Sequence, residues 1–179
     1  KNPEHREILA REPGWIPNAV EETLRFDPPS QYQGRTTTRA VEWHGQRIPE
    51  RSRVLLINGA SGRDERRFPD PDRYDVRREI AVQLGFGYGR HICLGASLAR
   101  LESRICLEEF LRRWPGYRIA PEGIERMHSS NVRGFSGRFT WLLAASAAGA
   151  ALELRSRKRD LYLVLLAGVA CAMALTSRR

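Results

Sequence analysis

The first 26 residues of this 179-residue chain contain two stretches that are typical of helices. Residues 4–12 form the first, and Pro13-Gly14 predicts its end. The second runs from residue 16 to residue 26, with proline early, where a helix tolerates it, and with an Asp-Pro-Pro stop after it. Its apolar residues follow helical spacing, at Ile16, Ala19, Val20 and Leu24.

Between residues 35 and 57 the pattern changes to short runs of β-branched and apolar residues. The runs cover residues 36–38, 41–44 and 54–57, with a turn predicted at Gly45-Gln46. A small sheet is therefore predicted. Residues 58–79 are polar and rich in proline, and they predict an irregular meander that packs through Phe68 and Tyr74.

A third helix is predicted after a glycine-rich loop at residues 86–95. Apolar residues at four-three-four spacing give it one face, and they are Leu94, Leu98, Leu101, Ile105, Phe110 and Leu111. We expect the helix to begin at Cys93 and to end at Trp114-Pro115-Gly116. The elements together predict a fold that is mainly α with a small β-sheet.

Beyond Gly137 the chain changes to two Ala/Leu-rich runs of fourteen and fifteen residues, separated by the basic stretch 155–159. We expect one domain over residues 1–138 and a divergent, helical tail over residues 139–179. Each run is shorter than the roughly 18 to 20 apolar residues that span a bilayer. Membrane contact by the tail is therefore left open.

Composition is that of a globular domain, with 41% hydrophobic and 28% charged residues. The net charge of +9 includes +4 from residues 139–179, and elsewhere arginines are interspersed with acids. No aromatic platform or Lys-rich arm indicates nucleic-acid binding. The three cysteines, Cys93, Cys106 and Cys171, lack zinc-type spacing and are odd in number, which favours a reduced, cytoplasmic setting.

The loop FGYGRHICLG places Cys93 among three glycines. Ile92 stands where a dinucleotide fingerprint requires glycine, and the P-loop Gly-Lys-Ser/Thr is absent. A thiol just before a helix lies near unpaired N–H groups, which favour the thiolate. Such a thiolate can be a nucleophile, a redox sensor or a metal ligand. His91 is poorly placed as its base, and the glycines leave room for a large flat group.

FGYGRHICLGASLARLE, residues 86–102, resembles the haem-ligand signature of the cytochrome P450 superfamily, Phe-Gly-x-Gly-x-x-x-Cys-x-Gly. The fixed positions are all matched, by Phe86, Gly87, Gly89, Cys93 and Gly95. The resemblance implies that Cys93 is the thiolate ligand of haem b, iron protoporphyrin IX. It also implies that Phe86, Gly87, Gly95 and Ala99 lie against the haem.

Other features of that family follow in the same order. EETLR supplies its Glu-x-x-Arg pair as Glu22 and Arg25, and PDRY supplies Arg73, which the resemblance implies completes a structural network beneath the haem. It further implies that Arg35 and His91 bind the haem propionates. We therefore expect Glu22, Arg25 and Arg73 to stabilise the scaffold, and Arg35 and His91 to bind the cofactor.

The resemblance spans about residues 1–138 and is closest to soluble bacterial members, so we expect the C-terminal part of a cytochrome P450 fold. It implies a monooxygenase that uses O2 to hydroxylate a small organic substrate, with electrons from a ferredoxin-type partner. The chain begins with Lys1 and has no counterpart of the family's distal helix, so we expect an inactive fragment. Residues 29–34 and 130–134 are expected to line the substrate pocket.

Two alternatives remain open at this point. One is an inactive haem-binding or membrane-associated remnant, and the other is a redox-sensing thiol protein. The helix after the cysteine carries basic residues that either receive an acidic electron donor or form a solvated face. These residues are Arg100, Arg104, Arg112 and Arg113.

Overall fold

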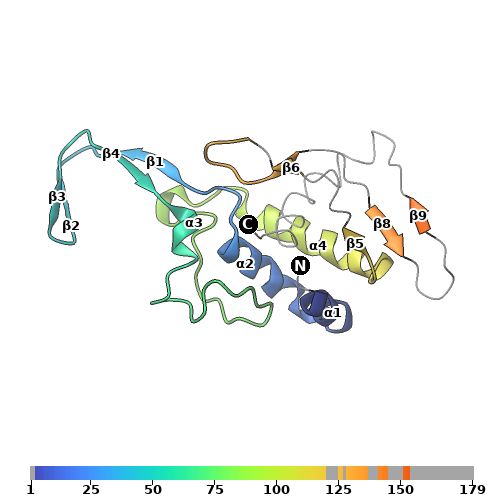
Figure 1. The fold of residues 1–179 in the computed structure, drawn as a ribbon. Helices are drawn as coiled ribbons and strands as arrows, with labels where there is room; N and C mark the ends of the chain where they lie inside the picture. The colour runs from blue at the N-terminus through green and yellow to red at the C-terminus, as the bar shows by residue number, and fades with distance from the viewer. Residues whose placement is uncertain (1–2, 120–124, 127, 137–140, 145–150, 154–179) are drawn as a thin grey trace.

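The computed structural model describes residues 3–119, 125–126, 128–136, 141–144 and 151–153 (Figure 1). Helices dominate the first part of the chain, and the strands form small antiparallel sheets. The predicted fold class, mainly α with a small β component, is confirmed.

Three helices of eight or more residues lie in the described part of the chain. They are α1 (Pro3–Arg11), α2 (Ile16–Phe26) and α4 (Ala96–Arg113). Shorter helical turns are η1 (Pro13–Trp15), α3 (Asn58–Ser61) and η2 (Gly89–His91). The prediction for α2 is confirmed at both ends, whereas α4 begins three residues after Cys93 because Gly95 is its N-cap.

The predicted sheet is two separate hairpin-like pairs. Strand β1 (Gln33–Thr36) pairs with β4 (Arg53–Leu56), and β2 (Val41–Trp43) pairs with β3 (Gln46–Ile48). The β2–β3 pair projects away from the helices (Figure 1). The turn predicted at Gly45-Gln46 is wrong by one residue. It lies at His44-Gly45, which have φ of 48° and 73°, because a two-residue turn of this hand needs positive φ at both positions.

The remaining strands are β5 (Arg118–Ile119), β6 (Glu125–Arg126), β7 (Phe135–Ser136), β8 (Trp141–Ala144) and β9 (Ala151–Glu153). Strand β8 pairs with β5 and β9, so the described residues of the tail are extended. The helical tail predicted over residues 139–179 stays a prediction. The rest of 139–179 lies outside the described residues. Within the described part, no helix combines the length and hydropathy needed to cross a bilayer.

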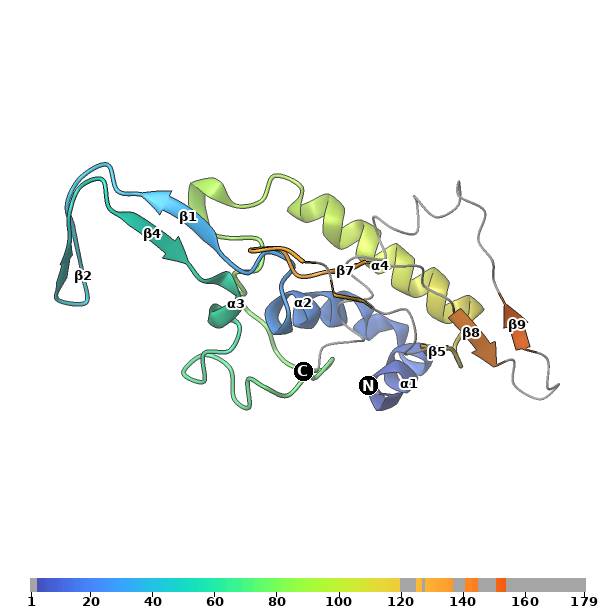
Figure 2. The same cartoon turned by 45° about the horizontal axis from the view of Figure 1, so that its top comes forward.

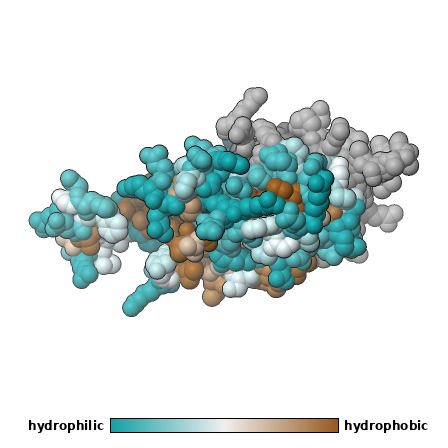
Figure 3. Space-filling view, turned by 90° about the horizontal axis from the view of Figure 1, so that it is seen from below, coloured by the Kyte–Doolittle hydropathy of each residue, from teal (hydrophilic) through white to brown (hydrophobic). Residues whose placement is uncertain are grey.

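The hydrophobic core lies where α1, α2 and α4 meet, with α4 crossing over α2 (Figure 2). Its buried members are Leu9, Ile16, Ala19, Val20, Leu24, Val76, Leu107, Leu111 and Tyr117. The predicted apolar stripe of α4 is largely not the core face, since Leu98, Leu101 and Ile105 are 46–58% exposed. The outer surface is mostly hydrophilic with local apolar patches, as Figure 3 shows for one face.

The meander between β4 and the cysteine loop packs onto α2 through its aromatic residues, as predicted. Phe68 is buried, and Tyr74 makes an edge contact with Phe26, with 5.6 Å between ring centroids. Gly62, at its start, lies so close to α2 that an added Cβ would stand 1.9 Å from the Arg25 carbonyl oxygen. The backbone approach at this point therefore excludes any side chain.

We expect Gly62→Ala to lower the free energy of unfolding of the chain by about 1 to 3 kcal/mol, because the methyl group must displace backbone. Denaturant titration measures this change. Gly14→Ala is the matched control, since nothing lies within 4 Å of a Cβ at that position. Equal effects of the two substitutions would show that the close approach at Gly62 is absent.

Candidate functional site

Cys93 lies in a loop that is held by its own backbone. The Cys93 N–H donates to the Phe86 carbonyl oxygen (2.8 Å), and the Cys93 carbonyl accepts from the Ala96 N–H (3.1 Å). Gly87 and Gly89 have φ of 76° and 71°, which glycine adopts without steric cost. The glycines of the motif thus set the path of the loop, and the cross-loop bond fixes the backbone of Cys93.

The thiol of Cys93 is exposed and forms no disulfide. A Cβ added at Gly95 would stand 4.0 Å from its Sγ, and a Cβ at Gly89 would meet nothing within 4 Å. The neighbouring apolar side chains are exposed as well, with Tyr88 at 77% and Leu94 at 103%. The loop therefore presents an accessible thiol beside uncovered apolar surface, an arrangement suited to a large, flat, apolar ligand.

The other residues predicted to hold the cofactor lie on three elements. Phe86, Gly87, His91 and Gly95 lie in the same loop as Cys93, and His91 is the last residue of its helical turn η2. Ala99 lies in the first turn of α4. His91 is exposed, whereas Phe86, Gly87 and Ala99 are half-buried. Arg35 lies on β1 and donates to Gln33 Oε1 (3.0 Å) and to the Gly34 carbonyl, not to the loop.

Glu22 and Arg25 form a fully buried ion pair on α2. Arg25 donates through Nε to Glu22 Oε2 (2.6 Å) and through Nη2 to Oε1 (2.8 Å), and both side chains are 0% exposed. Arg25 also donates to three carbonyl oxygens of the meander, those of Gly62 (2.5 Å), Pro71 (2.8 Å) and Arg73 (3.2 Å). The pair therefore ties the meander to α2.

The third member of this network in the structure is Arg78, whereas the sequence predicted Arg73. Arg78 Nε lies 3.3 Å from Glu22 Oε1, and its Nη atoms donate to the carbonyls of Pro69, Asp70 and Arg73. Arg73 is exposed and contributes its carbonyl oxygen. Both arginines lie in one polar segment, so the fold of the segment decides which reaches the carboxylate. The signal available in the sequence was the basic pair Arg77-Arg78.

The two segments predicted to line a pocket lie side by side. Ser30 and Val132 form an antiparallel bridge, the Gln31 N–H donates to the Asn131 carbonyl, and the Arg133 N–H donates to the Pro29 carbonyl (2.8 Å each). Arg133 also pairs with the buried Asp27 (2.7 Å). The structure thus brings together residues more than 100 positions apart in the sequence.

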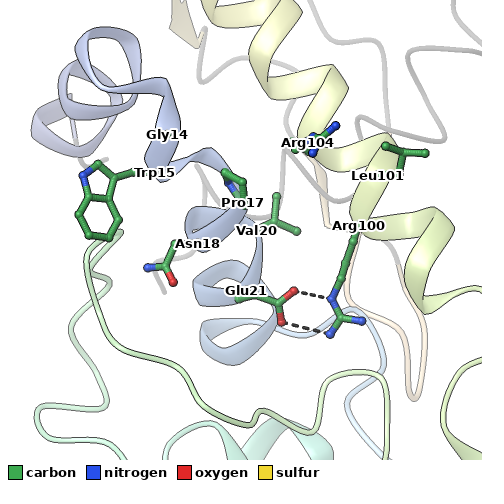
Figure 4. Close-up of a pocket in the computed structure, with 9 residues that line it drawn as sticks. All are labelled: Gly14, Trp15, Pro17, Asn18, Val20, Glu21, Arg100, Leu101 and Arg104. Carbon is green, nitrogen blue, oxygen red and sulfur yellow. Dashed lines mark hydrogen bonds and ion pairs between the residues drawn. The ribbon is translucent and has the colours of Figure 1, made fainter.

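A groove of about 550 Å³ lies between the start of α2 and α4 (Figure 4). It is lined by Gly14, Trp15, Pro17, Asn18, Val20, Glu21, Arg100, Leu101 and Arg104. Glu21 and Arg100 point toward each other across it and are joined by two hydrogen bonds, which raise the pKa of Arg100. None of these lining residues was predicted to contact the haem, and Glu21 was missed because its partners are remote in sequence.

Comparison with known proteins matches residues 16–118 to the family model "Cytochrome P450". Putative cytochrome P450 123 of Mycobacterium tuberculosis is 48% identical over 122 residues, 68% of this chain and 30% of that protein. The 6-deoxyerythronolide B hydroxylase of Saccharopolyspora erythraea is 42% identical over 114 residues, 64% of this chain and 28% of that protein. The chain thus spans about a third of the length of such relatives.

Solved structures agree with the sequence relatives. CYP109E1 from Bacillus megaterium, in complex with corticosterone, superposes with a TM-score of 0.72 at 32% identity, over 75% of this chain and 36% of that one. The matched segment holds the buried Glu22–Arg25 pair, the meander and the cysteine loop in one continuous stretch. On the sequence match, the shared fold and the loop geometry together, this chain belongs to the cytochrome P450 family.

Proposed function

We propose that this chain is the thiolate-bearing part of a haem monooxygenase that hydroxylates a small organic molecule with O2. The observation that carries the proposal is the exposed thiol of Cys93 in the loop before α4. The backbone of Cys93 is fixed there, because its N–H donates to the Phe86 carbonyl oxygen. Cytochrome P450s are haem b proteins, and in this family a single cysteine thiolate is the protein ligand of the haem iron.

The residues present fit such a cofactor. Cys93 would bind the iron, while Phe86, Gly87, Gly95 and Ala99 would lie against the porphyrin. Bound haem supplies the redox chemistry that activates dioxygen, and thiolate ligation favours O–O cleavage. The bare glycines and the exposed apolar side chains of the loop support this assignment, because they leave one side of the thiol uncovered.

Arg35 and His91 would bind the propionates by charge-assisted hydrogen bonds. In this structure the Arg35 guanidinium is held by Gln33 Oε1 at 3.0 Å, so it is already oriented along β1. Residues 29–34 and 130–134 would contribute one wall of the substrate pocket, as their antiparallel bridge supports. These residues would bind and orient the cofactor and the substrate.

The electron donor proposed is a ferredoxin-type protein in the cytoplasm. The exposed arginines of α4 are Arg104, Arg112 and Arg113, and they support an acidic partner, although Arg104 is paired with Glu108 and the other two are paired with Glu109. Relatives include a 6-deoxyerythronolide B hydroxylase and a structure of CYP109E1 with corticosterone. Substrates of that size, bulky and largely apolar, are the class that we propose for the parent enzyme.

A chimera tests the proposed function. Residues 16–118 replace the matching segment of 6-deoxyerythronolide B hydroxylase, whose remaining chain supplies the distal part of the fold. We expect the chimera to bind haem and to hydroxylate 6-deoxyerythronolide B with a ferredoxin-type donor, and we expect Cys106→Ser to leave turnover unchanged. A chimera that binds haem without turnover would favour the inactive haem-binding remnant. A folded chimera without haem would favour the thiol sensor.

A further inference from the structure

Glu21 joins the two ends of the segment that carries Cys93. Its Oε2 accepts from Gln83 Nε2 (3.1 Å), which precedes the loop, and from Arg100 Nη2 (3.1 Å), which follows it. Arg100 Nε also donates to Glu21 Oε1 (Figure 4). We propose that Glu21, Gln83 and Arg100, the Glu21 clamp, position the Cys93 thiol for its iron ligand, an inference that rests on the proposed function.

The first arm of the clamp runs through Gln83. While its Nε2 binds Glu21, its Oε1 accepts the N–H of Gly85. Gly85 directly precedes Phe86, whose carbonyl oxygen accepts the Cys93 N–H at 2.8 Å. Three consecutive hydrogen bonds and one peptide link therefore connect the Glu21 carboxylate on α2 to the backbone of the ligand residue.

The second arm runs through Arg100. Its guanidinium lies over the Phe86 ring, 4.9 Å from the centroid, which is within the range of a cation–π contact. Phe86 is itself half-buried against the hydrophobic core. Both arms thus converge on Phe86, the residue that fixes the Cys93 backbone. A planar guanidinium is needed here, because it forms two hydrogen bonds to a carboxylate and stacks on a ring at once.

The loop needs such an external anchor. Among the described residues, the backbone hydrogen bonds of 86–96 connect only residues 84–99 to one another, so they hold the shape of the loop, and side-chain contacts must set its place on α2. A ligand must be held within about 0.5 Å of its productive position. The Glu21 and Arg100 side chains are 26% and 40% exposed, and their hydrogen bonds are charge-assisted. The clamp is therefore suited to set position while lying at the surface.

Amide hydrogen exchange of the full 179-residue chain tests the clamp without haem. Glu21→Gln should speed exchange of the backbone amides of residues 85–95 about tenfold, as expected for weakening hydrogen bonds to a charged group. Glu109→Gln is the matched control, because Glu109 pairs with Arg112 at 2.7 Å on the same helix but away from the loop. Equal exchange in the two variants would overturn the proposal.

Two further variants sharpen the test. Gln83→Leu removes one arm alone. Arg100→Met combined with Glu21→Gln should change exchange by less than the sum of the two single effects, because both substitutions remove the same Glu21–Arg100 hydrogen bonds. Additive effects in the double variant, or no effect of Gln83→Leu, would overturn the clamp.

Haem reconstitution supplies the second readout. At equal haem content, Glu21→Gln, Gln83→Leu and Arg100→Met should each show a smaller thiolate-ligated fraction than wild type in the reduced carbonyl spectrum. Arg100→Lys should show a fraction between those of Arg100→Met and wild type. A purely structural role would lower haem content and leave that fraction unchanged, and this result would contradict positioning. A wild-type chimera without a thiolate spectrum, together with clamp-dependent exchange in the chain, would refute the proposed function and leave the clamp standing.

Discussion

Glu22→Gln is expected to lower the free energy of unfolding by about 3 to 5 kcal/mol, the range for breaking a buried ion pair from one side. The substitution keeps the shape of the side chain but leaves the Arg25 guanidinium charged and unpaired at 0% exposure. It also weakens the acceptor of the Asp75 N–H (2.8 Å) and of Arg78 Nε (3.3 Å). The meander should therefore loosen together with α2, as measured by denaturant unfolding.

Glu12→Gln is the control for this prediction. Glu12 pairs with Arg77 at 2.6 Å, but both side chains are about half exposed, so the change should stay within about 1 kcal/mol. The network also predicts an order among the arginines: Arg78→Met should destabilise the chain more than Arg73→Met. Equal costs for Glu22→Gln and Glu12→Gln would contradict the burial of the pair.

Cys93→His should abolish the red-shifted Soret band of the reduced carbonyl complex, in both the chimera and the haem-reconstituted chain. A neutral imidazole replaces the anionic sulfur that gives thiolate-ligated haem its spectrum and its reactivity. Because residue 93 is exposed, the free energy of unfolding should change by no more than about 0.5 kcal/mol. Loss of the band without loss of stability would separate ligation from folding.

Cys106→Ser serves as the comparison, since Cys106 lies on α4 and is only partly exposed. It should leave the Soret position unchanged whatever its effect on stability. An unchanged spectrum in Cys93→His, or the same shift in both variants, would show that Cys93 does not bind the iron.

The sequence alone determined the features that depend on neighbouring residues. Helix α2 was predicted at both ends because its stop signal, Asp27 and two prolines, is local. The cysteine loop was predicted for the same reason: positive φ at Gly87 and Gly89 and a thiol four residues later are requirements of one short segment. Family membership followed, because such local signatures occur in a fixed order.

Only the tertiary structure decided which residues meet across the fold. Arg78, not Arg73, reaches Glu22, and Glu21 binds partners 62 and 79 positions away. The exposed stripe of α4 shows the same limit, since helical spacing identifies an apolar face but not what covers it. These outcomes depend on how remote segments pack, because side chains of the same type compete for one buried carboxylate and the backbone path selects among them.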